Sequence, residues 1–130
     1  MHGKERAAPP IRVLIADDEP LLLQALGDVI GSSPDFEIVA TAANASDATR
    51  LAADLHPHVA LLDMRMPEGG GIAAAEGIRT SSPATRIVAL SAYEDAARIE
   101  AMRGAGAVAY VVKGAPAGDI IEALLGAAGA

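Results

Sequence analysis

The chain has 130 residues, a length that suits one domain of ordinary size. Its formal net charge is −7, and an acidic chain is poorly suited to bind a nucleic-acid backbone, because that binding depends on Lys and Arg. The absence of Cys excludes a disulfide framework and thiolate chemistry, and it suits the reducing cytoplasm. No apolar run approaches the roughly 20 residues that a membrane-spanning helix needs, so we expect no contact with a membrane.

The first ten residues differ in character from the rest. Residues 1–10 have no apolar stretch and end in two prolines, Pro9 and Pro10. This composition predicts a flexible leader and excludes a secretory signal within it. Residues 11–130 contain no linker and no sequence repeat, so we expect them to form a single domain.

Along residues 11–130, a short aliphatic run, a polar or Gly-containing turn and an Ala- and Leu-rich stretch follow one another five times. The aliphatic runs predict strands at residues 11–16, 36–40, 59–62, 86–90 and 108–112. The stretches between them predict helices at about 20–30, 45–55, 72–80 and 95–103, and a last helix follows that carries Ile120, Ile121, Leu124 and Leu125. Pro20 suits the first position of its helix, and Asn44 is expected to cap the next one.

Strands that alternate with helices indicate right-handed crossovers and a parallel sheet. The strands are almost continuously apolar, which is typical of a sheet covered by helices on both faces. We therefore predict the α/β class, as a three-layer α/β/α sandwich with a five-stranded parallel sheet of flavodoxin-like order 2-1-3-4-5. The helix at about 95–103 has the weakest apolar stripe, with Ile99 and Met102 among alanines.

Polar side chains follow four of the five predicted strands, at the point where each strand ends. They are Asp17, Asp18, Asp63, Ser91 and Lys113. Any one of them alone is more typical of a helix cap, a turn or a solvated surface. Together they fall at the same edge of a parallel sheet, where ligands bind at the point at which the strand order reverses. We therefore expect the three carboxylates to converge, with Ser91 and Lys113 to one side.

Three carboxylates in one pocket repel one another unless positive charge compensates them. A hard divalent cation does so, and oxygen ligands of this kind suit magnesium, or manganese in its place. Lys113 adds a further positive charge, and Ser91 adds a hydroxyl donor. Such a pocket suits a phosphoryl group, because phosphoryl transfer needs mostly positioning and charge stabilisation. A carboxylate nucleophile then gives a labile acyl phosphate.

With these residues assembled, the sequence resembles the CheY-like receiver domain of bacterial two-component response regulators, from about Ile11 to Leu125. The motifs that carry the resemblance are Asp17-Asp18, Leu62-Asp63-Met64-Arg65-Met66-Pro67, Ser91, and Tyr110-Val111-Val112-Lys113. Residues 35–39 are most similar to the NarL/FixJ (LuxR-type) subfamily, whose members commonly carry a C-terminal DNA-binding helix-turn-helix. The resemblance implies that Asp63 accepts a phosphoryl group from a sensor histidine kinase.

The same resemblance implies a role for each motif residue. Asp17, Asp18, Asp63 and the backbone carbonyl of Arg65 would bind the metal, and Lys113 would hold the phosphoryl group. Ser91 would bond to that group and move on activation, while Tyr110 would turn inward as a coupled aromatic switch. Pro67 and Gly71 would shape the loop after the phosphorylation site.

The sequence departs from the family pattern at three positions. Ser91 stands where Thr is commoner, and it keeps the hydroxyl. Arg65 places a long cationic side chain at the mouth of the site. Gly114 follows Lys113 where many receivers have Pro, which predicts a trans bond and a more mobile loop.

Two other functions are compatible with parts of the sequence. A haloacid-dehalogenase-type phosphatase also uses an Asp nucleophile and magnesium, but it expects a second acid at the place of Arg65. A receiver fold can also serve as a phosphorylation-independent interaction or dimerisation module. We favour a cytoplasmic signalling domain over an enzyme, with weak self-phosphorylation and autodephosphorylation. Its output is expected to be transcription through a DNA-binding domain absent from this chain, with homodimerisation on activation.

Overall fold

The computed structural model describes residues 9–92 and 96–129. Most of the leader predicted for residues 1–10 therefore lies outside the described residues, and so does Asp95, the expected start of the fourth helix. Among the described residues, no helix combines the length and the apolar character needed to cross a bilayer.

Strands and helices alternate through the described chain, as the sequence predicts. The strands are β1 (Ile11–Ala16), β2 (Phe36–Ala42), β3 (Val59–Asp63), β4 (Arg86–Ser91) and β5 (Ala107–Val112). The helices are α1 (Pro20–Gly31), α2 (Ala45–Leu55), α3 (Gly70–Ser81), α4 (Ala96–Gly104) and α5 (Ala117–Ala128). All strand pairs are parallel and the sheet order is β2-β1-β3-β4-β5, which confirms the predicted flavodoxin-like order.

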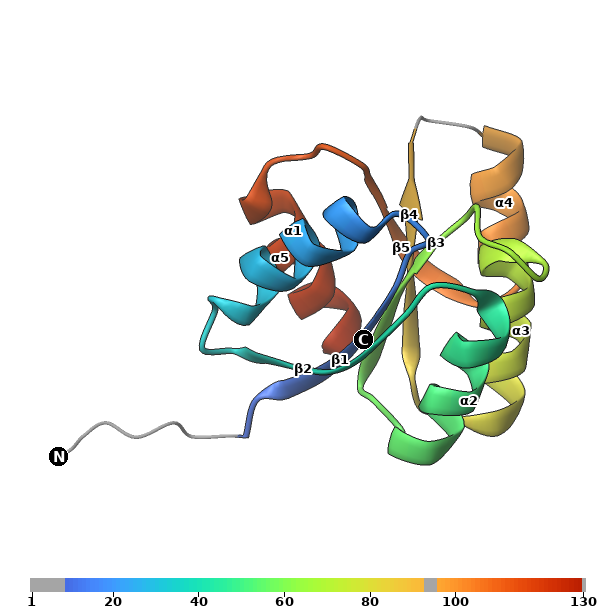
Figure 1. Cartoon of the computed structure of the whole chain (residues 1–130), viewed down its shortest axis with the longest axis horizontal. Coiled ribbons are helices and arrows are strands. Elements are labelled where there is room, and N and C mark those ends of the chain that lie inside the picture. The colour runs from blue at the N-terminus through green and yellow to red at the C-terminus, as the bar shows by residue number, and fades with distance from the viewer. Residues whose placement is uncertain (1–8, 93–95, 130) are drawn as a thin grey trace, which may run out of the picture.

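Helices cover both faces of the sheet and make three layers (Figure 1). Helices α1 and α5 lie on one face, and α2, α3 and α4 lie on the other. Each face buries its own aliphatic core, because strand side chains alternate between the two faces. Every residue of β3 is buried, as expected for a central strand with helices above and below it.

Two predicted boundaries were wrong by two residues. Helix α3 begins at Gly70 rather than near Ile72, so Gly70 and Gly71 belong to its first turn. The turn before it places Glu68 and Gly69 at φ 69° and 101°, a tight reversal that lets the helix start directly behind β3. Strand β2 extends to Ala42, since Thr41 and Ala42 continue the ladder against β1.

Helix α2 is anchored at its start and packs closely on α3. Asn44 caps it as predicted, with its side chain accepting the backbone N–H of Asp47 at 2.8 Å. Gly77 of α3 faces Thr49 of α2 so closely that an ideal Cβ at residue 77 would lie 2.6 Å from Thr49 Oγ1. The two helices therefore meet where α3 has no side chain.

We expect Gly77→Ala to lower the free energy of unfolding by about 1–3 kcal/mol, because the new methyl group forces α2 and α3 apart. This loss outweighs the gain of about 1 kcal/mol that Ala brings within a helix. Gly126→Ala is the matched control, since an ideal Cβ there meets nothing within 4 Å, and it should stabilise the chain. Urea denaturation of both variants measures the contrast, and equal stability of the two would contradict the close packing.

Candidate functional site

Three carboxylates converge where the strand order reverses. Asp17 and Asp18 follow β1, Asp63 ends β3, and one carboxylate oxygen from each lies within 4.8 Å of the others. Asp17 is 0% exposed and Asp63 is 2% exposed, whereas Asp18 faces solvent. The parallel sheet brings these residues together because β1 and β3 are neighbours whose carboxyl ends share one edge. The predicted convergence is confirmed.

Backbone groups fix the two buried carboxylates. The N–H of Glu19 donates to Asp17 Oδ1 at 2.9 Å, and the N–H of Arg65 donates to Asp63 Oδ1 at 3.1 Å. Asp17 Oδ2 has no hydrogen-bond partner, and no other buried side-chain oxygen or nitrogen among the described residues shares that condition. A buried, ionisable oxygen without a donor is costly, so this atom indicates a site built to receive a ligand.

Lys113 brings the compensating positive charge. Its Nζ donates to Asp63 Oδ2 at 3.1 Å and lies 3.6 Å from Asp17 Oδ2. The lysine is held in place because its backbone N–H donates to the carbonyl of Ser91 at 2.6 Å, which joins the ends of β4 and β5. One ammonium group is thus shared by the two buried acids, as the sequence predicts for its place after β5.

These contacts shift two pKa values in the same direction. Burial raises the pKa of Asp17, and repulsion from Asp63 adds to this rise, while the N–H of Glu19 opposes it. Burial alone lowers the pKa of Lys113, but its hydrogen bond to Asp63 and the nearby carboxylates outweigh burial and raise that pKa. The pocket therefore favours the charged form of Lys113, and it makes the ionised form of Asp17 energetically costly.

Asp17→Asn is expected to stabilise the metal-free chain at neutral pH by about 1 kcal/mol, or roughly 4 °C in Tm. Because the pKa of Asp17 is raised in the folded state, its ionised form lowers the free energy of unfolding at neutral pH. The destabilisation by ionised Asp17 decreases as the pH falls below the raised pKa of the folded state toward the ordinary value of 3.8, because the carboxylate then takes up a proton. The extra stability of the variant should therefore shrink over this pH range. Thermal melts in EDTA across this pH range measure it. A variant less stable than the wild type throughout would contradict the cost assigned to Asp17.

The donor set fits a hard divalent cation. It offers carboxylate oxygens from Asp17, Asp18 and Asp63 close together, one of them buried without a donor. Magnesium takes one or two carboxylates and completes its shell with water and phosphate oxygens, which suits a site with one solvent-facing acid. The arrangement can therefore bind a cation and present the Asp63 carboxylate to a phosphoryl group.

A hollow opens beside Asp63 at the carboxyl edge of the sheet. Its lining is Asp63, Met64, Arg65, Ser91, Ala92, Arg98 and Lys113. A wider, open hollow continues from it past Asp18 and Pro67. Ser91 is buried at 4% exposure and lines the same hollow as Asp63.

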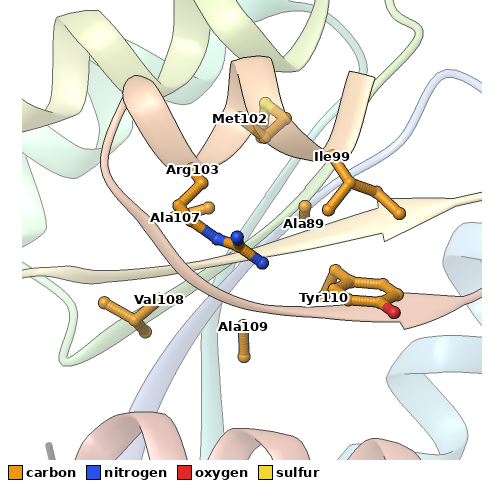
Figure 2. A pocket seen from close by; sticks show the side chains of 8 residues that line it. All are labelled: Ala89, Ile99, Met102, Arg103, Ala107, Val108, Ala109 and Tyr110. Atoms are coloured by element: carbon orange, nitrogen blue, oxygen red, sulfur yellow. The ribbon is translucent and has the colours of Figure 1, made fainter. Parts of the chain in front are cut away.

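The predicted switch residue Tyr110 lies away from the carboxylates. It is 39% exposed on β5 and lines a separate groove between α4 and β5 (Figure 2). Ala89, Ile99 and Met102 line the same groove, with Ile99 on the α4 side and the Tyr110 ring on the β5 side. Tyr110 therefore lines a groove separate from the hollow that contains Asp63.

The loop after β3 shapes the site through two of its predicted residues. The carbonyl of Pro67 accepts the N–H of Ala45 at 3.2 Å and so ties the loop to the start of α2. Gly71 lies against β3, where an ideal Cβ would stand 2.6 Å from the carbonyl oxygen of Asp63. Glycine at this position lets the first turn of α3 approach the backbone of Asp63 itself.

Sequence reasoning missed Arg98. This residue lies on α4, and its side chain lines both hollows over Asp63. A basic residue early in the helix that follows Ser91 was the available signal, because that helix begins at the carboxyl edge of the sheet. Sequence patterns also gave no sign that Met64 lines the hollow or that the backbone N–H of Glu19 donates to Asp17.

Comparison with known proteins identifies the family. The model of the response regulator receiver domain matches residues 13–125. This chain belongs to that family. The fold and the acidic pocket described above are what the receiver resemblance of the sequence predicted, and the phosphatase alternative is left without support.

Relatives and solved structures agree with the assignment. The chain is 40% identical over 119 residues to the transcriptional regulatory protein PdtaR of Mycobacterium tuberculosis, covering 91% of this chain and 57% of PdtaR. It is 32% identical over 114 residues to LiaR of Bacillus subtilis, covering 88% and 54%. The receiver domain of a response regulator NarL from Mycobacterium tuberculosis superposes with a TM-score of 0.89 at 29% identity, covering 94% of this chain and 98% of that one.

The receiver is of the type found in NarL- and LuxR-family regulators, as expected from residues 35–39. The chain spans about half the length of the transcriptional regulators that it matches, for example 52% of LnrK and 54% of YxjL from Bacillus subtilis. A domain of this family thus occurs in those proteins together with further sequence.

Proposed function

We propose that this receiver is a phosphorylation switch in which Asp63 accepts a phosphoryl group from a sensor histidine kinase. The observation that carries the proposal is the shared ammonium of Lys113, which contacts the carboxylates of both Asp17 and Asp63 at the edge of the sheet. Family membership supports the same reaction. In it, an oxygen of Asp63 forms a bond to phosphorus while the bond from phosphorus to the donor breaks, and the donor keeps that electron pair.

The residues of the chain divide the work of this transfer. The N–H of Arg65 holds Asp63 Oδ1, which leaves the carboxylate oriented toward the hollow. Lys113 then holds the oxygens of the incoming group, and the hydroxyl of Ser91 donates to one of them. Magnesium, or manganese in its place, supplies charge compensation for the acids and the phosphoryl oxygens. Asp17, Asp18, Asp63 and the carbonyl of Arg65 would hold it.

The switch is proposed to run from Ser91 to Tyr110. Both residues lie on adjacent strands that pair in parallel, with Ala89 of β4 opposite Tyr110 of β5. If Ser91 is drawn toward the phosphoryl group, space opens under α4 for the ring of Tyr110 to turn inward. The groove lined by Ala89, Ile99 and Met102 is where that ring would move (Figure 2).

Helix α4 is the element most suited to move with the switch. Met102 is its only buried residue among those described, whereas α3 buries five. A helix with so little buried apolar surface is weakly held and readily shifts between two positions. We propose that its movement changes the α4–β5 face and favours homodimerisation. The output is transcription through a DNA-binding domain outside this chain, in the cytoplasm, and the domain acts as a signalling switch rather than an enzyme.

Phosphoryl uptake can be tested by incubating the chain with acetyl phosphate and magnesium and measuring its intact mass. We expect a gain of one phosphoryl group, about 80 Da, that disappears when EDTA replaces magnesium. Asp63→Asn is the matched control and should show no gain under either condition. If neither acetyl phosphate nor a panel of phosphorylated histidine kinases labels the wild type, the phosphorylation-independent interaction module becomes the better account.

A further inference from the structure

The charge balance of the site leaves room for one more cation after phosphorylation. The three converging carboxylates face one ammonium group and the divalent cation that they fit, so the charges of these groups cancel before transfer, and Arg65 and Arg98 are the other cations that line the hollow. Replacing the carboxylate of Asp63 with an acyl phosphate adds about one further negative charge. If Asp63 is phosphorylated as proposed above, a further cation that lines the hollow can compensate this added charge.

Arg98 is positioned to compensate the added negative charge of the acyl phosphate. It comes from the first part of α4, a different element from those that supply the other charged groups. Its side chain lines the hollow together with Asp63, Ser91 and Lys113, and also the wider hollow that includes Asp18. The guanidinium group presents several N–H donors in a plane, a geometry that matches phosphate oxygens better than an ammonium does.

We propose that Arg98 is a second phosphoryl-binding cation, which contacts the phosphoryl group on Asp63 and thereby draws in the start of α4. Lys113 approaches the group from the end of β5, and Arg98 approaches it from the helix. Because α4 buries only Met102 among its described residues, a single charge-assisted contact is enough to bias its position.

The neighbour of Arg98 in the chain gives this contact a consequence. Ile99 lines the groove that holds Tyr110, on the side of α4 that faces β5 (Figure 2). Arg98 and Ile99 are consecutive in α4. Arg98 therefore faces the hollow beside Asp63, while Ile99 faces the groove that Tyr110 lines. A shift of Arg98 toward the phosphoryl group moves Ile99 as well, so α4 carries the signal along a route separate from Ser91.

Beryllofluoride in the presence of magnesium mimics the phosphoryl group and provides the test. We expect Arg98→Gln to bind beryllofluoride about tenfold more weakly than the wild type, the loss that fits one charge-assisted hydrogen bond in a partly exposed site. Arg98→Lys should recover most of this affinity. Arg50→Gln removes the same charge from an exposed position on α2, where Arg50 pairs with Asp47 at 3.3 Å, and should bind as the wild type does. NMR titration measures all four proteins.

Hydrogen exchange of the wild type and of Arg98→Gln gives a second test. Beryllofluoride should slow amide exchange in α4, residues Ala96–Gly104, and Arg98→Gln should lose most of this protection. Suppose that the wild type binds beryllofluoride and Arg98→Gln binds it with equal affinity, or that binding does not slow amide exchange in α4. Either result would overturn the role of Arg98 and leave the phosphorylation of Asp63 standing. A wild type that binds no beryllofluoride would overturn both.

Discussion

Lys113→Met is expected to slow the uptake of phosphoryl from acetyl phosphate by about a hundredfold. The ammonium lies 3.1 Å from Asp63 Oδ2, so it is positioned to neutralise the charge that develops on the phosphoryl oxygens during transfer. Methionine keeps much of the length of the side chain and removes that charge. Single-turnover labelling followed by intact mass spectrometry gives the rate.

Magnesium affinity separates this effect from general damage to the domain. Removing the ammonium leaves the three carboxylates without their positive neighbour, so Lys113→Met should bind magnesium more tightly than the wild type while transferring phosphoryl more slowly. Arg50→Met is the matched control, since Arg50 pairs with Asp47 at an exposed site on α2. If Lys113→Met were labelled at the wild-type rate, Lys113 would not act on the phosphoryl group.

Gly71→Ala is expected to lower the free energy of unfolding by about 3 kcal/mol and to impair labelling of whatever folded protein remains. The new Cβ would lie 2.6 Å from the carbonyl oxygen of Asp63 and 3.0 Å from Cα of Met64. Both neighbours are backbone atoms, one in the last residue of β3 and one in the residue that follows it, so relief requires that α3 or the end of β3 move. Movement of β3 displaces the carboxylate of Asp63 from Lys113.

The control for Gly71→Ala is another helical glycine near a helix start. Gly118 lies in the first turn of α5, and an ideal Cβ there meets nothing within 4 Å. Gly118→Ala should leave both stability and labelling close to those of the wild type. Denaturant melts and phosphoryl labelling of the pair decide the matter. Equal behaviour of Gly71→Ala and Gly118→Ala would show that α3 does not press on the acceptor strand.

The sequence predicts the sheet and most of the site because both depend on repeating local patterns. Nearly continuous apolar runs fix the buried strands, and the alternation with helices fixes their parallel direction. Once the strand order is right, Asp17 and Asp63 meet because β1 and β3 are neighbours, and Lys113 falls on the same edge because all strands are parallel. No contact between side chains had to be known beforehand.

Features that depend on exact backbone paths were not predictable. The early start of α3 depends on positive φ at Glu68 and Gly69, and glycine runs are equally typical of a loop. Gly114 similarly has φ 84°, a conformation closed to proline, and its sequence context gave no sign of that. The approach of Arg98 to the hollow depends on where α4 lies on the sheet, and its weak apolar stripe leaves that position undetermined by sequence.

The most direct measurement is chemical trapping of the acyl phosphate. After incubation with acetyl phosphate and magnesium, borohydride reduces an aspartyl phosphate to homoserine, and peptide mass spectrometry then locates the modified residue. We expect homoserine at position 63, present with magnesium and absent with EDTA. Homoserine at another aspartate, or an unmodified Asp63 after exposure to acetyl phosphate and phosphorylated histidine kinases, would contradict it.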